Sequence, residues 1–373
     1  MIKKLSLLLF TAVVMQAQSI EQLGEMLFFD VSLSKNRTQS CATCHNPEHG
    51  FVDDRDNGID SMVSLGDDKK SRGARNAPTA AYAMISPHFQ YDSKKQQYIG
   101  GQFLDGREST LAGQAGGPPL NPVEMGMSDK KMIIDRLKEN KTYVKILKEN
   151  FGEKILEDVD RAYEAMRSSI EAFEKSKTFA PFDSKYDRYL KDEYDLSVLE
   201  DLGRTLFFSN NNLTCAKCHL LKAEDEAGET FSNYEYHNIG VPSNPVLIEK
   251  GIVPADFIDH GLLDNPLITD KKHDGKFKVP TLRNIAVTAP YMHNGVFKSL
   301  KAVMEFYDKY NNKKRVNNTD TNKPWAKPEV NATVNLDLLK AKKLTDRKID
   351  ALIAFMKILT DKRYEHLLEE KKW

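Results

Sequence analysis

Apolar residues recur at helical spacing in several long stretches of this chain, and few stretches alternate with the period of two that marks a strand. One such helical pattern runs from Lys130 to Lys175. Another begins after Thr345, which we expect to cap the helix, and comprises Ile349, Leu352, Ile353, Phe355, Met356 and Leu359. The pattern predicts a mainly α-helical protein with long connecting loops.

One short pattern of apolar positions occurs twice. Residues 23–30 read LGEMLFFD, and residues 202–209 read LGRTLFFS. Each predicts an amphipathic helix that buries its Leu and Phe side chains. We therefore interpret the chain as an internal duplication, with one domain over residues 20–190 and a second over residues 191–373.

The N-terminal residues have the pattern of an export signal. Lys3 and Lys4 precede an apolar run over residues 5–14, and the small residues Ala17 and Ser19 follow it. Such a run is too short to span a bilayer, and no later apolar run is long enough to do so. We expect residues 1–19 to be a cleaved signal peptide, and the mature protein to be periplasmic with no membrane span.

Charge and length limit the kind of protein further. The 373 residues include 54 basic and 54 acidic residues, so the formal net charge is zero. This balance argues against nucleic acid as a partner, and the length favours two domains. Lysine-rich runs such as residues 340–343 lie near acids and are interpreted as solvated faces.

The cysteines form two similar motifs. Residues 41–45 read CATCH and residues 215–219 read CAKCH, and the chain has no other cysteine. Four cysteines in an exported protein could form two disulfides or a zinc site, but neither requires histidine directly after the second cysteine. In a Cys-x-x-Cys-His turn, the two thiols can bond to one porphyrin while the histidine ligates its iron. We predict two covalently bound c-type haems, held by Cys41, Cys44 and His45 and by Cys215, Cys218 and His219.

Beyond these motifs, the sequence resembles the bacterial di-haem cytochrome c peroxidase and MauG family over nearly the whole mature chain. The resemblance rests on blocks in the family's order: RNAPT at 75–79, GGQFLDGR at 100–107, QAGGP at 114–118, NPVEMG at 121–126, YHNIGVP at 236–242, VPTLRN at 279–284 and TAPYMHNG at 288–295. It implies two c-type cytochrome domains, each built around one haem: an N-terminal peroxidatic domain and a C-terminal electron-transfer domain.

The resemblance implies a catalytic pair in the N-terminal half. Peroxide reduction requires a group that moves a proton between the two peroxide oxygens. Glu124 lies in a Pro/Gly-rich loop ten residues after Gln114, and the family places its distal acid/base and amide at these positions. The alternative is that Glu124 only accepts hydrogen bonds from loop amides and that Gln114 is a surface residue.

The resemblance also bears on whether the first iron is open. Many family peroxidases carry a histidine after a Ser-x-Gly pattern, and it blocks the iron until the other haem is reduced. Here residues 64–66 read SLG and are followed by Asp67, while His49 and His88 stand elsewhere. We predict an iron at His45 that needs no reductive activation.

The second haem has two candidate axial ligands, Met304 and Tyr307. They lie at i and i+3 of a helix expected to begin near Leu300, so spacing alone does not choose between them. The family's axial residue falls at Tyr307, where MauG-like members have tyrosine and other peroxidases have methionine. The resemblance therefore implies a MauG-like ligand at His219's haem, and an anionic tyrosinate favours the ferric state.

Two further features come from the resemblance. The family usually has a tryptophan between its haems at the position of Leu104, so electron transfer here must use direct tunnelling, a porphyrin edge or another aromatic such as Phe103. The family also binds calcium from positions that correspond to Asn76, Thr288 and Pro290, through oxygen ligands of the kind that calcium prefers. Lys278 and Arg283 are candidates for pairing with haem propionates.

Three functions remain open from the sequence. The first is an oxidoreductase of the cytochrome-c peroxidase type, which reduces hydrogen peroxide with electrons from a small cytochrome c or cupredoxin. The second is MauG-like oxidation of a protein or organic substrate, and the third is a di-haem electron carrier. A homodimer is left open.

Overall fold

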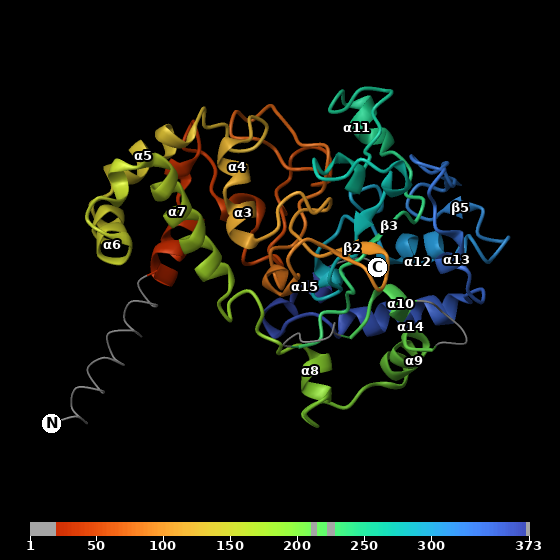
Figure 1. Ribbon diagram of the computed structural model, residues 1–373. Helices are drawn as coiled ribbons and strands as arrows, with labels where there is room; N and C mark the ends of the chain where they lie inside the picture. Colours follow the sequence, from red (N-terminus) through yellow and green to blue (C-terminus); the bar gives the residue numbers. More distant parts are fainter. Residues whose placement is uncertain (1–19, 210–214, 222–227, 371–373) are drawn as a thin grey trace. The chain divides into compact units, whose positions relative to one another are not determined.

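The computed structural model describes residues 20–209, 215–221 and 228–370. The predicted signal peptide, residues 1–19, lies outside these ranges. The described chain consists mainly of helices and loops, as the apolar pattern predicts, with three short two-stranded antiparallel ribbons (Figure 1). None of the described helices is long and apolar enough to cross a membrane.

The chain divides into two compact units. The first unit contains the residues up to His45, Leu65–Gly73 and Thr110–Ala180, and the second contains Asn46–Ser64, Ala74–Ser109 and the residues from Pro181 onward. Two stretches of the N-terminal half thus pack within the second unit. The sequence did not predict this packing, because long-range contacts leave no trace in local periodicity. The domain bounds expected from the duplication, residues 20–190 and 191–373, remain a prediction.

The first unit is a small set of helices. It contains helical residues 20–28, the 3₁₀ turns η1 (Val31–Leu33) and η3 (Ile155–Glu157), and the helices α2 (Cys41–Cys44), α3 (Leu111–Ala115), α4 (Gly117–Leu120), α5 (Lys130–Glu139), α6 (Lys141–Phe151) and α7 (Val159–Glu174). The single helical pattern from Lys130 to Lys175 is therefore three helices. Asn140 ends α5 and caps α6 by accepting from the Thr142 amide, and Gly152, with φ of 102°, ends α6.

A glycine sets the packing of the first helix. A Cβ at Gly24 would lie 1.8 Å from the Ser169 carbonyl oxygen, so the helix over residues 20–28 meets the backbone of α7 directly. Beside this crossing, Phe28 packs edge-to-face on Phe173 and Phe179, with both pairs of ring centroids 5.5 Å apart. This crossing lies at the base of the loop that leads to α2.

The second unit holds most of the chain. Its helices are α8 (Lys185–Tyr189), α9 (Val198–Phe207), α10 (Cys215–Cys218), α11 (Pro245–Glu249), α12 (Leu300–Asp308), α13 (Leu336–Leu339), α14 (Asp346–Lys357) and α15 (Leu367–Glu370). The ribbons pair β1 (Gln90–Asp92) with β2 (Gln97–Ile99), β3 (Tyr236–His237) with β4 (Phe277–Lys278), and β5 (Asn317–Asn318) with β6 (Lys323–Pro324). The 3₁₀ turns are η2 (Ala83–Ile85), η4 (Leu262–Asp264), η5 (Lys271–His273), η6 (Ile285–Val287) and η7 (Lys362–Tyr364).

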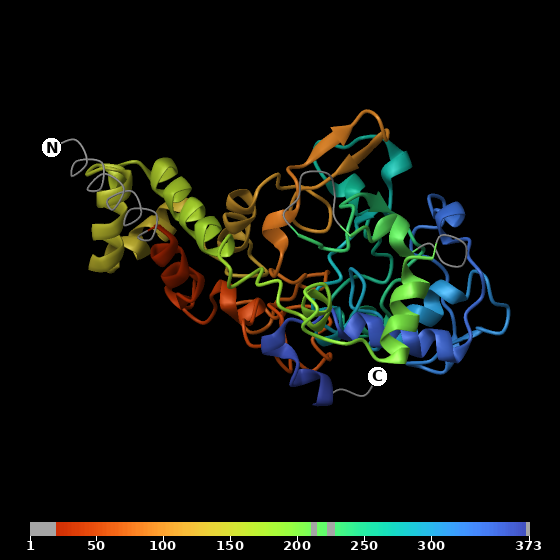
Figure 2. The same cartoon turned by 90° about the horizontal axis from the view of Figure 1, so that it is seen from below.

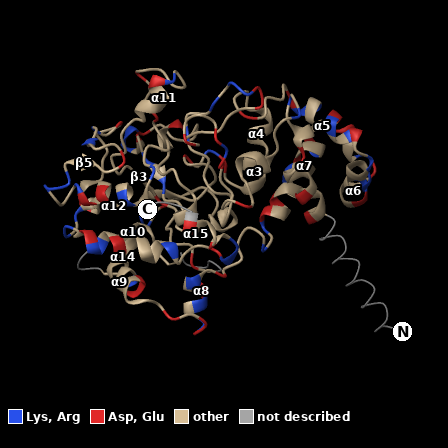
Figure 3. Ribbon diagram, turned by 180° about the vertical axis from the view of Figure 1, so that it is seen from behind, with Lys and Arg blue, Asp and Glu red and all other residues tan. Residues whose placement is uncertain are grey.

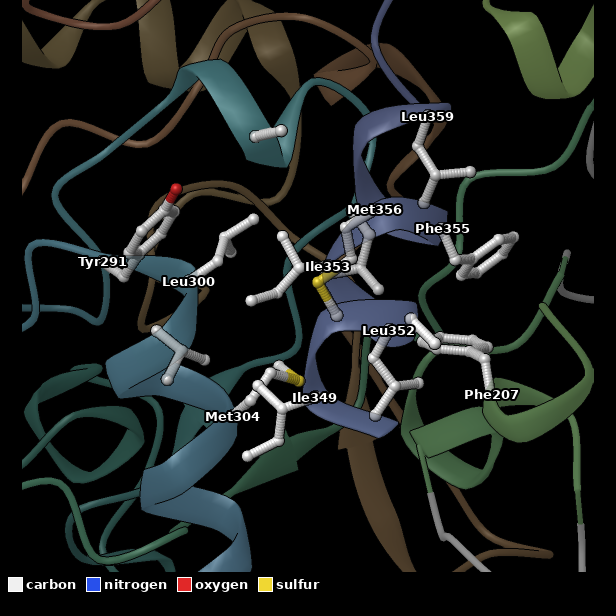
Figure 4. Packing of buried hydrophobic residues seen from close by; sticks show 14 of the residues in the cluster. Phe207, Tyr291, Leu300, Met304, Ile349, Leu352, Ile353, Phe355, Met356 and Leu359 are labelled. Atoms are coloured by element: carbon white, nitrogen blue, oxygen red, sulfur yellow. The ribbon is translucent and has the colours of Figure 1, made fainter. Parts of the chain in front are cut away.

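The core of the second unit lies between α9, α12 and α14. Thr345 caps α14 by accepting from the Lys348 amide, as predicted. The apolar stripe of α14 packs against Phe207 of α9 and Leu300 of α12 (Figure 4). The α9 helix runs beside α14 in both views (Figure 1, Figure 2) because Gly203 allows contact: a Cβ there would lie 1.9 Å from the Ala351 carbonyl oxygen.

Candidate functional site

The first Cys-x-x-Cys-His turn lies at α2 of the first unit. Ser40 and Thr43 form a capping box at the start of this helix, and the His45 amide closes its end on the Cys41 carbonyl. Burial raises the pKa of the Cys41 thiol, and the nearby carboxylates of Glu174 and Glu124 raise it further. The fold therefore brings Glu124, a predicted catalytic residue, close to the predicted attachment turn.

Glu124 is held in a tight turn. Its amide donates to the Asn121 carbonyl, and its Oε1 accepts from the Asn121 side-chain amide at 2.7 Å. This contact orients the carboxylate and belongs to the block over residues 121–126. Gln114 lies at the end of α3, the helix that packs against α7, and both Gln114 and Glu124 are half-buried.

Asp67 ties the loop before α2 to the Glu124 turn. Its carboxylate accepts from the amides of Asn36 and Thr38, at 2.7 and 3.3 Å, and from the Thr38 hydroxyl at 2.7 Å. Its own amide donates to the Glu124 carbonyl at 2.7 Å. Burial acts to raise the pKa of Asp67, but these hydrogen bonds and that of Ser34 lower it on balance. Asp67 is thus an ionised structural clamp.

Glu174 is a buried carboxyl that the sequence reading missed. Burial raises the pKa of Glu174 to about 8, and its Oε2 accepts no hydrogen bond from the described residues. A signal was present, because Glu174 lies four residues after Ile170, on the apolar stripe of α7. An acid on such a stripe indicates a buried polar site.

In the second unit, the other Cys-x-x-Cys-His turn opens onto a large cavity. The cavity has a volume of about 370 Å³, within the range of cofactor sites. Its wall includes both cysteines of α10, His219 and the two candidate axial residues of α12, Met304 and Tyr307. None of the four cysteines forms a disulfide bond.

His219 is oriented as a metal ligand would be. Its Nδ1 lies 2.9 Å from the Phe231 carbonyl oxygen, which places the ring proton on Nδ1 and leaves Nε2 as the ligand nitrogen. Burial lowers the pKa of His219 to about 4, so the ring is neutral. A neutral imidazole with a fixed tautomer, two thiols on the same turn and an adjoining apolar cavity fit a haem.

Tyr307 and Met304 differ in their surroundings. Tyr307 is half-buried and lines the same cavity as Cys215 and Cys218. Desolvation raises the pKa of its phenol. Met304 packs with Ile349 of α14 in the apolar core (Figure 4). Both residues line the cavity, so the choice of Tyr307 over Met304 as the axial ligand stays a prediction.

The residues predicted for calcium all lie along the same cavity. Asn76, Thr288 and Pro290 are part of its wall. Asn76 donates from its side-chain nitrogen to the Met62 carbonyl at 3.0 Å, and its amide donates to the His293 carbonyl. Neither contact uses the side-chain oxygen of Asn76, which is the atom that a cation would bind. Within the described ranges, His, Cys, Asp and Glu side chains form no metal-binding group.

Leu104 and Lys278 meet at the cavity wall. The Lys278 amide donates to the Leu104 carbonyl, and the Lys278 ammonium donates to the Gly101 carbonyl. Burial lowers the pKa of Lys278 to about 7, which suits a lysine that gains an anionic partner. Arg283 instead forms two hydrogen bonds to Asp187, at 2.6 and 2.9 Å, so Lys278 is the better candidate for a propionate.

These two sites, each a Cys-x-x-Cys-His turn within a mainly helical unit, define the class of two-haem cytochromes. The chain belongs to the di-haem cytochrome c peroxidase and MauG family. A family model described as "Di-haem cytochrome c peroxidase" matches residues 18–195. The family implies two haems, while their attachment through the cysteines remains a prediction.

Relatives of both subgroups match the chain. The methylamine utilization protein MauG of Paracoccus denitrificans is 45% identical over 358 residues, which cover 95% of this chain and 92% of that protein. The cytochrome c551 peroxidase of Pseudomonas aeruginosa is 31% identical over 285 residues, covering 75% and 69%. The solved structure of the di-haem peroxidase BthA from Burkholderia thailandensis matches with a TM-score of 0.80 at 28% identity, covering 93% and 87%.

Proposed function

We propose that this protein reduces hydrogen peroxide to water with electrons from a small periplasmic redox protein. The observation that carries the proposal is the Glu124 carboxylate, held by Asn121 close to the first attachment turn. A carboxylate fixed there can take a proton from one peroxide oxygen and return it to the other. The reaction balances as one peroxide, two electrons and two protons giving two waters.

The proposed roles of the remaining residues follow from their places. Each haem, when bound, supplies an iron that exchanges electrons one at a time. In the first unit, Gln114 would donate to the substrate from its side-chain amide, and His45 would hold the peroxide-reactive haem. In the second unit, His219 and Tyr307 would hold the electron-transfer haem. Asn76, Thr288 and Pro290 are the proposed calcium ligands. The predicted signal peptide is the basis for proposing export to the periplasm.

A second function is favoured by Tyr307. The half-buried Tyr307 lines the same cavity as the second attachment turn, and MauG of Paracoccus denitrificans is 45% identical to this chain. An anionic oxygen ligand stabilises the oxidised form of a metal more than a thioether does. In this alternative, the electrons for peroxide come from a protein or organic substrate instead of a small electron carrier.

The test is steady-state peroxide consumption by the holoprotein with ascorbate and a diffusible phenylenediamine mediator. Glu124→Gln keeps the shape of the side chain but cannot act as a base, so we expect kcat to fall by about 10²- to 10⁴-fold. Glu157→Gln, an exposed acid in the same unit, is the matched control and should retain activity. Equal haem absorbance in all three proteins would show that attachment is intact.

The outcomes separate the candidates. Unchanged turnover in Glu124→Gln would contradict the acid/base role. A wild-type protein whose spectrum changes with peroxide, but which consumes no peroxide with the mediator, would favour the MauG-like alternative. Two low-spin ferric signals in the oxidised protein would leave no open iron and would favour an electron carrier.

A further inference from the structure

A basic surface segment follows α12 in the second unit. Residues 313–327, which include the β5–β6 ribbon, carry five basic residues and one acidic residue. Arg315 is neutralised by Glu305, Asp308 and Asp346. The remaining positive charge is on four exposed lysines that form no ion pair with any described residue, Lys313, Lys314, Lys323 and Lys327.

This local charge differs from the rest of the molecule. The whole chain has formal net charge zero, so a segment with unpaired lysines creates a local positive field. Figure 3 shows blue segments on the loop beside β5. Lysines on the first unit are often paired within one or two helical turns, as in Lys131 with Asp135 and Lys145 with Glu149.

One half-buried aromatic residue lies within the basic segment. Trp325 is fixed by two hydrogen bonds: its amide donates to the Val316 carbonyl, and its indole nitrogen donates to the Arg315 carbonyl at 2.9 Å. Its ring lies 5.9 Å from that of Phe306, centroid to centroid. Phe306 is fully buried in α12, so Trp325 joins the surface segment to the core.

The aromatic contact continues to the haem cavity. The Phe306 ring lies 5.8 Å from that of Tyr307, which lines the same cavity as Cys215 and Cys218. Three rings in series therefore connect the basic surface with the cavity of the second unit. The Lys309 ammonium lies 4.3 Å from the Phe306 centroid and 5.4 Å from that of Trp325. A cation there disfavours a resident hole on either ring, so the rings act as a tunnelling bridge.

We propose that the lysines of residues 313–327 form the docking surface for a small acidic redox protein, and that Trp325 is the point where its electron enters. The inference rests on the proposed function, because it gives the electron donor's binding site for that reaction. Each docking event oxidises one donor by one electron, which passes through Trp325 and Phe306 to the Tyr307 side of the cavity. Two donors are oxidised for each peroxide reduced.

Binding tests the docking surface without relying on turnover. The probe is an acidic plastocyanin, titrated into the holoprotein by calorimetry at an ionic strength of about 20 mM, where charge interactions reach far. We expect Lys→Gln substitution of all four lysines of the docking surface to weaken the binding of plastocyanin by about tenfold or more. The matched control changes four exposed lysines of the first unit, Lys131, Lys138, Lys141 and Lys145, and should bind like the wild type.

Two further measurements complete the test. Carbodiimide cross-linking of the wild type to plastocyanin should join its carboxylates to lysines of residues 313–327. Trp325→Leu should keep the affinity but slow oxidation of reduced plastocyanin about tenfold, and Trp325→Phe should recover part of the rate. The proposal would be overturned by cross-links elsewhere, or by equal affinity for plastocyanin of the docking-surface variant and the control variant.

The failure of the inference is distinguishable from failure of the proposed function. Turnover with the small mediator needs no docking, so the docking-surface variant should consume peroxide with the mediator as fast as the wild type does. If the mediator supports turnover while plastocyanin binds both quadruple variants equally, only the docking surface is wrong. If the mediator supports no turnover in the wild type, the proposed function itself fails.

Discussion

The two units use the same helix contact but surround their attachment turns differently. In each, a glycine ahead of the turn brings a helix onto the backbone of a long helix: Gly24 onto Ser169, and Gly203 onto Ala351. The first unit places Glu124 and Glu174 near its turn, whereas in the second the half-buried Tyr307 lines the cavity beside the turn. The helix contact is thus common to both units, while loop and helix residues outside it surround each turn differently.

The largest expected effect comes from breaking the shared contact. Gly203→Ala would place a Cβ 1.9 Å from the Ala351 carbonyl oxygen, and Gly24→Ala would place one 1.8 Å from that of Ser169. Because backbone cannot yield as a side chain can, we expect each change to lower the free energy of unfolding by about 3 kcal/mol or more. Chemical denaturation followed by circular dichroism measures it.

Gly73→Ala provides the control for these variants. Gly73 has no atom within 4 Å of an added Cβ, so this change should leave stability within about 0.5 kcal/mol of the wild type. A Gly203→Ala protein as stable as Gly73→Ala would show that the two helices do not meet as described.

Much of this scaffold was predictable from local pattern. The repeated LGxxLFF segments and the Thr345 cap predicted helices that the structure contains, because periodicity and capping are local properties. The break of residues 130–175 into three helices was missed, although Asn140 and Gly152 were signals for it. The packing of residues 46–64 and 74–109 into the second unit depends on distant contacts, which periodicity does not record.

The second prediction sharpens the difference between the two sites. Tyr307→Phe removes the only phenol oxygen proposed as an iron ligand, so the low-spin ferric signal of the second haem should be lost from the low-temperature EPR spectrum. Loss of an anionic ligand should also raise the reduction potential by on the order of 0.1 V, or about 2.3 kcal/mol.

Tyr310→Phe is the matched control, since its hydroxyl donates to the Ile239 carbonyl and the residue lies one turn further along. It should keep both the low-spin signal and the potential. If Tyr307→Phe kept the low-spin signal while Met304→Leu lost it, Met304 would be the ligand, and the two sites would differ less than we propose.

The site was predictable only in part, for a physical reason. The two Cys-x-x-Cys-His motifs place their chemistry within five residues, so sequence alone identifies them. Glu174 and the Asn121 contact depend on which buried faces meet, and no spacing rule contains that information. Asp67 was noticed as a departure from the family, but its hydrogen bonds to the loop at Asn36 and Thr38 required the structure.

The smallest expected effect tests whether Asp67 fixes the first site in its present form. Asp67→Asn keeps the size of the side chain but replaces the carboxylate that accepts hydrogen bonds from Asn36 and Thr38 with a neutral amide. We expect the free energy of unfolding to fall by about 1–2 kcal/mol at neutral pH. The exposed Asp135→Asn is the control and should change stability by less than about 0.5 kcal/mol.

The pH dependence of this difference identifies the carboxylate as its source. The folded pKa of Asp67 is lowered from an ordinary value of 3.8, so the folded state binds its proton less readily than the unfolded state does. The stabilisation is therefore complete above the unfolded value, shrinks as the pH falls below it and is lost below the folded pKa. Unfolding measured from neutral to acid pH should show wild type and Asp67→Asn converging. A gap that stays constant into acid would assign the effect to packing, and the clamp on the Glu124 turn would then not depend on charge.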